Sequence, residues 1–420
     1  MDDPSEPDLI SDLPLSIMES ILTLLPIRDA VKTSVLSSKW RYRWASIQQL
    51  VFDDRCVDNE KPNVQGDLAN FITHCLLLHN APIHKFKLRT TQLQGCPDID
   101  QWILFLSRRD IKELFVELYG EEEWFRAPAS LFSCSKLTHL ELSRCELDPP
   151  SSFKGFSFLR VLSLQQVSAA PEVIENLIAN SPLLEKLSLS YFDSLELSIS
   201  APNLKILYLD GEFREINLVN APLLVDITVA LYMPDDYAEL FEHSSRCNFE
   251  HFLGGVSNLE RLVGYTYFAK YLSIGIEQWE HKVTYHHLKI IELYRVSFED
   301  IDEILVILHL IMSSPNLEEL HISGSSNTVC SPDDPDMIFL ETQYPSGCRC
   351  DKLKSVRITD LSGLANEMEF VKFLLGNAPA LQMMYMTPSC YVSNMKTYML
   401  IELLRFRRAS PRAQIIFTQD

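Results

Sequence analysis

The sequence has 420 residues, of which 46% are hydrophobic and 22% are charged, enough for two or three domains or one long repeat array. It has 37 Lys and Arg and 57 Asp and Glu, which gives a net charge of -20. This negative charge argues against a polyanion such as duplex DNA as a partner of the whole chain. The longest apolar stretches, such as Ile304–Met312, fall short of the roughly 18 apolar residues that a membrane helix needs. We therefore expect neither a nucleic-acid partner nor a membrane partner.

The composition also bears on the cellular location. The start of the chain is acidic and has neither the basic nor the apolar segment of a secretory signal. Ten Cys are too few for a disulfide scaffold in a chain of this length, and no Asn lies in an Asn-x-Ser/Thr acceptor site. These features predict a reducing location, the cytoplasm or the nucleus or both.

The first predicted element is a helix that opens at Leu13-Pro14 and that Pro26 ends. Its apolar residues fall on two stripes, one with Ile17, Ile21 and Leu24 and the other with Met18, Leu22 and Leu25. The first of these stripes is expected to carry surplus apolar surface that a partner covers.

Two more short helices are expected before residue 47. The second can begin at Asp29 as its N-cap, and a third follows around Ser38, with Trp40 and Trp44 one helical turn apart. Three helices in fewer than 40 residues carry more apolar surface than they can bury among themselves. This surplus again predicts that the segment binds another protein.

Internal repeats begin near residue 80. Runs of the form L-x-x-L-x-L start at 83, 111, 137, 159, 184, 204, 224, 259, 288, 317, 353 and 381, with spacings of 20 to 36 residues. Five of them open with Ser or Ala, then Pro, any residue and Leu, as in Ala201-Pro202-Asn203-Leu204. The last two apolar residues of a run point to one face of a strand, and one such unit cannot bury that face alone. The units are therefore expected to stack into a solenoid.

The pattern resembles a leucine-rich repeat, most fully from Leu137 to Leu147, where Cys145 takes the Asn/Cys position of that repeat. Helical spacing in Pro171–Ala179 and in Ile301–Met312 places a helix before the next Pro. The expected cross-section has helices on the convex side and strands on the concave side. The fold class is α/β: a small three-helix domain, then an irregular repeat solenoid.

Residues between the two strand leucines are expected to face the concave surface. They form a stripe of mixed character: Phe115, Glu141, Ser163, Ser188, Tyr208, Thr228, Val263, Glu292, His321, Arg357 and Tyr385. Asp210, Tyr265 and Tyr294 lie at neighbouring outward positions, and aromatic residues are frequent anchors of interfaces. The substrate-binding residues predicted from this surface are Tyr208, Asp210, Tyr265, Glu292, Tyr294, His321 and Arg357.

Two parts of the chain resemble known domains. The string Leu13-Pro-x-x-Ile17 through Trp40-Arg-x-Arg-Trp44 closely resembles an F-box of the variant typical of a large plant family. Residues Leu353–Ile358, Glu367–Leu375 and Leu403–Pro411 resemble the FBD domain, which usually accompanies an F-box and leucine-rich repeats in plants. This resemblance divides the chain into an F-box at 8–55, leucine-rich repeats at 80–345, and an FBD region at 346–420 that continues and caps the solenoid.

The resemblance implies a non-catalytic subunit of an SCF (Skp1-cullin-F-box) ubiquitin ligase. The F-box would bind the Skp1-type adaptor, and through it the cullin-RING ligase, while the solenoid captures the protein to be ubiquitinated. The residues assigned to the adaptor interface or its immediate support are Leu13, Pro14, Ile17, Ile21, Leu24, Val31, Val35, Leu36 and Trp40. Two alternatives stay open: a small-molecule ligand in the concave surface that gates binding, and a protein-binding scaffold that is not coupled to ubiquitination.

The sequence contains no familiar catalytic or cofactor motif. It lacks Gly-x-Ser-x-Gly, the phosphate-binding Gly-x4-Gly-Lys-Ser/Thr and His-Glu-x-x-His, and we expect no cofactor. Cys348 and Cys350, with Cys330 and His321 upstream, do not have the spacing of zinc ligands, so reduced loop thiols are the favoured interpretation. The C-terminal residues Arg405, Arg407, Arg408 and Arg412 form a basic patch, interpreted as a solvated helix end rather than a nuclear-import or phosphate site.

Overall fold

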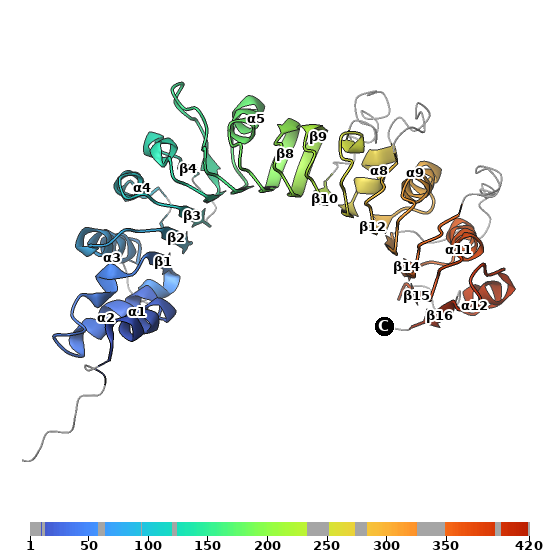
Figure 1. The fold of residues 1–420 in the computed structure, drawn as a ribbon, viewed down its shortest axis with the longest axis horizontal. Coiled ribbons are helices and arrows are strands. Elements are labelled where there is room, and N and C mark those ends of the chain that lie inside the picture. Colours follow the sequence, from blue (N-terminus) through green and yellow to red (C-terminus); the bar gives the residue numbers. More distant parts are fainter. Residues whose placement is uncertain are drawn as a thin grey trace, which may run out of the picture. The chain divides into compact units, whose positions relative to one another are not determined.

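The computed structural model of the chain describes residues 10, 13–57, 64–93, 95–119, 124–232, 252–273, 284–325, 349–390 and 396–418. They belong to two compact units, Met1–Tyr191 and Phe192–Asp420. In each unit, parallel strands form a sheet and most helices lie on one side of it (Figure 1). No helix within the described ranges is long and apolar enough to cross a membrane.

The first unit contains the predicted F-box and the first repeats. Its helices are α1 (Leu15–Leu24), α2 (Ile27–Lys32), α3 (Val64–Leu78), α4 (Asp98–Ser107) and α5 (Pro171–Ala179), with the 3-10 helices η1 (Thr33–Val35), η2 (Arg43–Ser46), η3 (Asp54–Cys56) and η4 (Ala129–Ser133). Its sheet pairs, in this order, β1 (Gln49–Asp53), β2 (Lys85–Thr90), β3 (Glu113–Leu118), β5 (His139–Ser143), β7 (Val161–Gln165) and the first part of β8 (Lys186–Ser200). The short strands β4 (Phe125–Arg126) and β6 (Cys145–Glu146) pair separately.

The second unit holds the rest of β8 and the later repeats. Its other strands are β9 (Ile206–Asn220), β10 (Asp226–Leu231), β11 (Arg261–Thr266), β12 (Ile290–Val296), β13 (Glu319–Gly324), β14 (Ser355–Leu361), β15 (Met383–Pro388) and β16 (Gln414–Phe417). Its helices are α8 (Phe268–Ser273), α9 (Ile301–Met312), α11 (Ala365–Asn377) and α12 (Lys396–Arg405). Strands β9 to β16 pair in chain order and in parallel, so the parallel pairing continues to residue 417.

The apolar positions of the repeat frame form the core. Leu140 and Leu142 of β5 are 1% exposed and pair in register with Leu162 and Leu164 of β7, which are fully buried. Each strand therefore covers the apolar flank of the previous one, as the repeat pattern predicts. The helices predicted at Pro171–Ala179 and Ile301–Met312 are confirmed with these bounds.

The helix expected on the convex side is absent from the two shortest described repeats. Strands β8 and β9 are each 15 residues long, and a short turn without a helix leads from β8 to β9 and from β9 to β10. These repeats start only 20 residues apart, at 184, 204 and 224. A spacing that short leaves no room for a helix beside a strand of this length, so the chain returns in extended conformation.

A left-handed residue bends the chain at one repeated position, two residues after the second apolar strand residue. It occurs in the first unit at Arg144, Gln166 and Tyr191, with φ of 56°, 52° and 58°. In the second unit it occurs at Thr266, Arg295 and Asp360, and Gly211 takes the same place with φ 149°. A Cβ on Gly211 would lie 2.7 Å from the carbonyl oxygen of Phe192, so this bend requires glycine.

The F-box segment differs from its expected three helices. Helix α2 begins at Ile27, directly after Pro26, so the expected start at Asp29 is wrong and Asp29 lies inside the first turn. Residues 38–42 form turns rather than an α-helix, followed by η2. Tyr42 has a φ of 63°, a left-handed conformation that an α-helix through this segment could not contain. Trp40 and Trp44 are nevertheless both buried, at 2% exposure.

Helix α9 begins with two acidic residues that satisfy backbone groups. The Asp300 carboxylate accepts hydrogen bonds from the amides of Asp302 and Glu303, and the Glu303 carboxylate accepts one from the Ser297 amide at 3.0 Å. Burial raises the pKa of Glu303 from 4.5 to about 7. Between these two pH values, the folded protein therefore holds a proton here that the unfolded chain has released, so stability falls as pH rises through this window.

We predict that Glu303→Gln removes this part of the pH dependence. The unmodified chain should lose stability between pH 5 and pH 8, by on the order of 2 kcal/mol from this group, because the buried carboxyl must ionise. The variant should lose less over the same range and be the more stable of the two at pH 8. Melting temperatures of both chains across this range test this. Parallel pH profiles would show that Glu303 does not titrate in this window.

Candidate protein-binding surfaces

Helix α1 buries one of its two apolar stripes and exposes much of the other. Met18 and Leu22 are 3% and 0% exposed, whereas Ile17 is 46% and Leu24 is 85% exposed. Side chains three and four residues apart share a helix face, so the buried residues belong to one face and the exposed ones to another. The F-box segment therefore has its own small core and an apolar face that no described residue covers.

The nine residues assigned to the adaptor interface divide by exposure. Five are exposed: Pro14, Ile17, Leu24, Val35 and Leu36. Three are partly buried: Leu13, Ile21 and Val31. Trp40 is buried, and its indole N–H donates to the carbonyl oxygen of Ile10 at 3.2 Å. Trp40 is thus placed to support the surface rather than to form it.

Leu15 and Tyr42 are among the exposed apolar residues of this segment that the sequence assignment missed. Leu15 is 54% and Tyr42 is 56% exposed. Helix α1 and 3-10 helix η1 both pack against η2, so Leu15, Val35 and Tyr42 come from elements that contact one another or adjoin that contact. Leu15 lies between the motif residues Pro14 and Ile17 and could have been found from that position. Tyr42 lies at the left-handed bend described above, which the sequence did not indicate.

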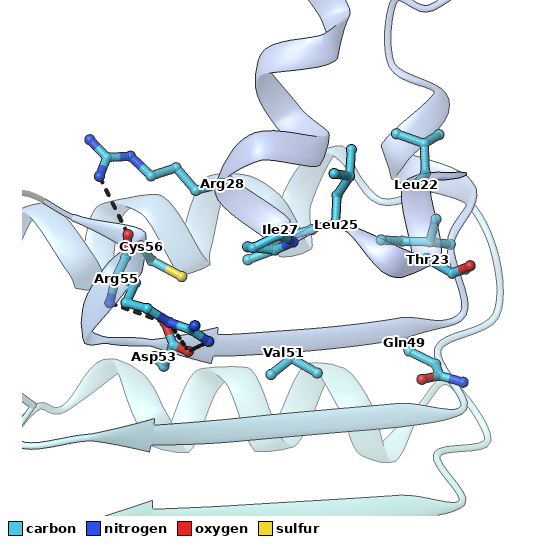
Figure 2. A pocket seen from close by; sticks show the side chains of 12 residues that line it. Leu22, Thr23, Leu25, Ile27, Arg28, Gln49, Val51, Asp53, Arg55 and Cys56 are labelled. Carbon is cyan, nitrogen blue, oxygen red and sulfur yellow. Dashed lines mark hydrogen bonds and ion pairs between the residues drawn. The ribbon is translucent and has the colours of Figure 1, made fainter. Parts of the chain in front are cut away.

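The F-box segment packs directly on the first strand. A small hollow of about 80 Å³ lies where the end of α1 and the start of α2 meet β1 (Figure 2). It is lined by Leu22, Thr23, Leu25, Pro26, Ile27, Arg28, Ile47, Gln49, Val51, Asp53, Arg55 and Cys56. Pockets that enclose drug-sized ligands have about 300–1,000 Å³, so this hollow is a packing seam rather than a ligand site.

Hydrogen bonds link the F-box helices to the residues that follow them. Arg28 of α2 donates to the carbonyl oxygens of Arg55 and Val57 at 3.4 Å each, and Figure 2 shows its side chain extended toward that turn. The imidazole of His79, at the end of α3, hydrogen-bonds the carbonyl oxygen of Ile47 at 2.8 Å, a buried contact. A partner on the F-box would therefore bind to a body that is continuous with the first repeats.

The residues of the predicted stripe in the second unit lie side by side on successive strands. The pairing register aligns Tyr208, Thr228, Val263, Glu292, His321, Arg357 and Tyr385 in one row across the sheet. Asp210 and Tyr265 occupy a second row, each opposite Ala230. Six of the seven predicted substrate-binding residues are at least partly exposed. The seventh, Asp210, is buried, at 8% exposure.

A hydrogen-bonded cluster occupies the middle of this row. Arg261 donates to one Glu292 oxygen from two guanidinium nitrogens, at 2.9 and 3.2 Å, and Tyr294 donates to the other oxygen at 2.9 Å. Burial acts to raise the pKa of Glu292, but these hydrogen bonds and the Arg261 charge hold it below its ordinary value. Glu292 is therefore a carboxylate at neutral pH with both oxygens engaged.

Aromatic rings extend the cluster. Tyr265 stacks on Tyr294 with ring centres 4.6 Å apart and planes 7° from parallel, and His321 packs edge-on against Tyr294 at 4.9 Å. The Tyr294 hydroxyl lies 3.3 Å from Nδ1 of His321. Since that hydroxyl gives its proton to Glu292, Nδ1 is the donor to the hydroxyl oxygen. Burial, with the Arg357 charge, lowers the pKa of His321, so the ring is neutral at pH 7.

Two polar groups, one on His321 and one on Arg357, flank the rings. Nε2 of His321 is buried and has no hydrogen-bond partner among the described residues. Arg357 is exposed, with its guanidinium 5.4 Å from the centre of the Tyr385 ring, and forms no ion pair with a residue that the structure describes. The row thus offers stacked aromatic surface beside one accessible cation, an arrangement suited to aromatic and acidic side chains of a protein partner.

The structure gives no support for a metal centre within its described ranges. No group of three or more His, Cys, Asp or Glu is close enough there to hold a metal ion. His321 belongs to the aromatic cluster, and Cys350 is a buried free thiol. Cys330 and Cys348 lie outside the described residues.

Comparison with known proteins matches three family models along the chain. An F-box domain model matches residues 10–50, and a model of the leucine-rich repeats of FBD-associated F-box protein At5g56370 matches residues 99–322. An FBD model matches residues 343–385. F-box/FBD/LRR-repeat protein At1g13570 of Arabidopsis thaliana is 56% identical to this chain, over 99% of both. The chain belongs to the plant F-box/FBD/leucine-rich-repeat family.

More distant members of this F-box/FBD/leucine-rich-repeat family also match over nearly their whole length. Probable FBD-associated F-box protein At1g32375 of Arabidopsis thaliana is 25% identical over 98% of this chain and 100% of its own length. FBD-associated F-box protein At5g56370 of the same plant is 26% identical over the same shares. The resemblance to an F-box and to an FBD domain noted in the sequence is thereby confirmed.

Proposed function

We propose that this protein is the substrate-recognition subunit of an SCF-type ubiquitin ligase, acting without catalytic residues of its own. The F-box segment binds the Skp1-type adaptor, and the second unit binds the target. The observation that carries the proposal is the exposed apolar face of the F-box, because Leu24 and Val35 are 85% and 87% exposed although the segment has a core of its own. Apolar side chains that contribute nothing to folding are expected at an interface.

The direct packing of α2 on β1 supports the same proposal. A ligase receptor must hold its target at a defined position relative to the adaptor. The hydrogen bond of His79 with Ile47 and the pairing of β1 with β2 join the F-box to the first repeats. We further propose that the protein acts in the cytoplasm, the nucleus or both, where the reduced cysteines expected from the sequence persist.

The adaptor interface predicts a loss of binding without a loss of folding. Leu24→Asp with Val35→Asp should reduce binding to a purified Skp1-type adaptor at least about tenfold, because each buried apolar side chain contributes about 1.5–3 kcal/mol. The melting temperature should stay within a few degrees of the unmodified chain, because both side chains are exposed. A pulldown with the full chain, alongside thermal melts, measures both.

The matched control for this adaptor experiment is Leu77→Asp. Leu77 is 71% exposed but lies in α3, outside the F-box match. It should leave adaptor binding unchanged. If the F-box variant binds as well as the control while both remain folded, the adaptor does not use this face.

The target-binding surface makes a separate prediction. Tyr265→Ala with Arg357→Ala should deplete the proteins that copurify with the full chain from plant cells in which cullin neddylation is inhibited, since both side chains are exposed beside the aromatic cluster. Adaptor recovery should not change. Quantitative mass spectrometry of the two purifications provides the measurement.

The control for target binding pairs Tyr191→Ala with Arg108→Ala, an exposed tyrosine and an exposed arginine of the first unit. If both double variants retain the same copurifying proteins, targets bind elsewhere. Proteins that bind the row but do not accumulate when neddylation is inhibited would instead favour the scaffold that is not coupled to ubiquitination.

A further inference from the structure

The last strand, β16, is less buried than the strand before it. Met384 and Met386 of β15 are fully buried, and the register pairs them with Ile415 and Phe417 of β16. Those two residues occupy the same core positions of the frame but are only partly buried. Each earlier strand is covered by its successor, whereas no described residue covers the outer flank of β16.

The outer edge of β16 also leaves backbone groups without strand partners. On its inner edge, the amide of Gln414 donates to the carbonyl oxygen of Gln382, directly before β15, at 2.9 Å, and the amide of Thr418 donates to that of Met386 in β15 at 3.0 Å. Backbone groups alternate between the two edges of a strand, so those of Ile415 and Phe417 point to the outer edge. Among the described strands, only β15 pairs with β16. Such an edge is a template for one more strand.

The neighbouring helix α12 shows a second unpartnered apolar surface. It buries only Met399 and Leu403. Leu400 and Leu404, four residues apart and therefore on one face, are 44% and 81% exposed, and Ile401 beside them is 45% exposed. The terminal repeat therefore exposes apolar surface on its helix as well as on its strand.

The same segment is cationic in an acidic protein. Residues 396–418 contain five Lys and Arg and one acidic residue, whereas the whole chain has a net charge of -20. Arg405 pairs with Glu402 at 2.7 Å. Arg407, Arg408 and Arg412 are exposed and form no ion pair with any described residue. The charge that would complement this end of the chain is negative.

We propose that the terminal repeat, residues 396–418, is a docking surface for an acidic segment of a partner protein that adds to β16 as an extended strand. Its backbone completes the hydrogen bonds of Ile415 and Phe417, and alternate apolar side chains cover their exposed flank. Its negative charge is complementary to the exposed Arg407, Arg408 and Arg412. This surface shares no residue with the F-box face or with the Tyr265–Tyr294 cluster, so it goes beyond the proposed function.

The test uses the full chain and a fluorescent synthetic peptide of about ten residues, the length of a long strand, in which Val and Ile alternate with Asp and Glu. A control peptide has the same composition with the apolar residues grouped together. Fluorescence anisotropy should show binding of the alternating peptide that is at least about tenfold tighter than that of the control, because only alternation places all apolar side chains on one face of a strand.

Two variants of the chain separate the strand edge from the charge. Ile415→Pro removes an amide that points outward and leaves the inner bonds with β15, so it should weaken binding of the alternating peptide about fivefold or more. Arg407→Glu with Arg408→Glu should weaken it by a similar factor. The matched control, Arg108→Glu with Lys154→Glu, reverses two exposed charges of the first unit and should leave binding unchanged.

Four results would overturn the proposal. If both peptides bind alike, or if Ile415→Pro has no effect in a folded chain, the attraction is one of charge alone. Absence of binding by the alternating peptide would exclude strand addition. A dimer of the full chain in light scattering that Ile415→Pro dissociates would show that the occupant is a second copy.

Discussion

Every strand of this fold depends on the next one to cover its apolar flank. The side chains at the two inward positions of a strand, such as Leu140 and Leu142, become buried only when a neighbour in the same register lies beside them. The free energy of folding is therefore gained at the boundaries between repeats rather than within a repeat. The same dependence fixes the row of outward residues, because the register that buries the leucines also aligns Glu292, His321 and Arg357 on adjacent strands.

The two ends of the repeat array meet this requirement differently. At the first strand, α2 and the seam lined by Ile27, Ile47 and Val51 cover β1, so the F-box helps to complete the repeats as well as presenting its own surface. At the last strand, Ile415 and Phe417 stay partly exposed. An apolar surface left over at either end has the same physical meaning: the described part of the chain supplies no neighbour for it, and a partner can.

The strand positions could be predicted from the sequence because they depend on a local pattern of period two. The helix bounds of Pro171–Ala179 and Ile301–Met312 could also be predicted, since a proline or a capping Asp300 begins each helix and the apolar residues recur at helical spacing. The left-handed bends at Arg144 and Gln166 could not, because these residue types have no intrinsic preference for positive φ. The tertiary structure imposes it.

The candidate surfaces were predictable only as lists of residues. Alternation identified Glu292 and Tyr294 as outward-facing, but the stacking of Tyr265 on Tyr294 depends on where neighbouring strands bend, and the left-handed Thr266 and Arg295 follow directly after these tyrosines. In the F-box, periodicity gave two stripes of α1 without indicating which one the core takes. Which stripe is buried depends on how α1 packs against η2. The turn at Tyr42 sets the position of η2.

Hydrogen–deuterium exchange of the full chain, with and without a purified Skp1-type adaptor, tests the central claim most directly. The account predicts that the adaptor protects the backbone of residues 15–24 and 31–36, whose apolar side chains are exposed in the free chain, while β11 to β14 exchange at unchanged rates and remain free for a target. Protection confined to those strands, with none in the F-box segment, would contradict the account.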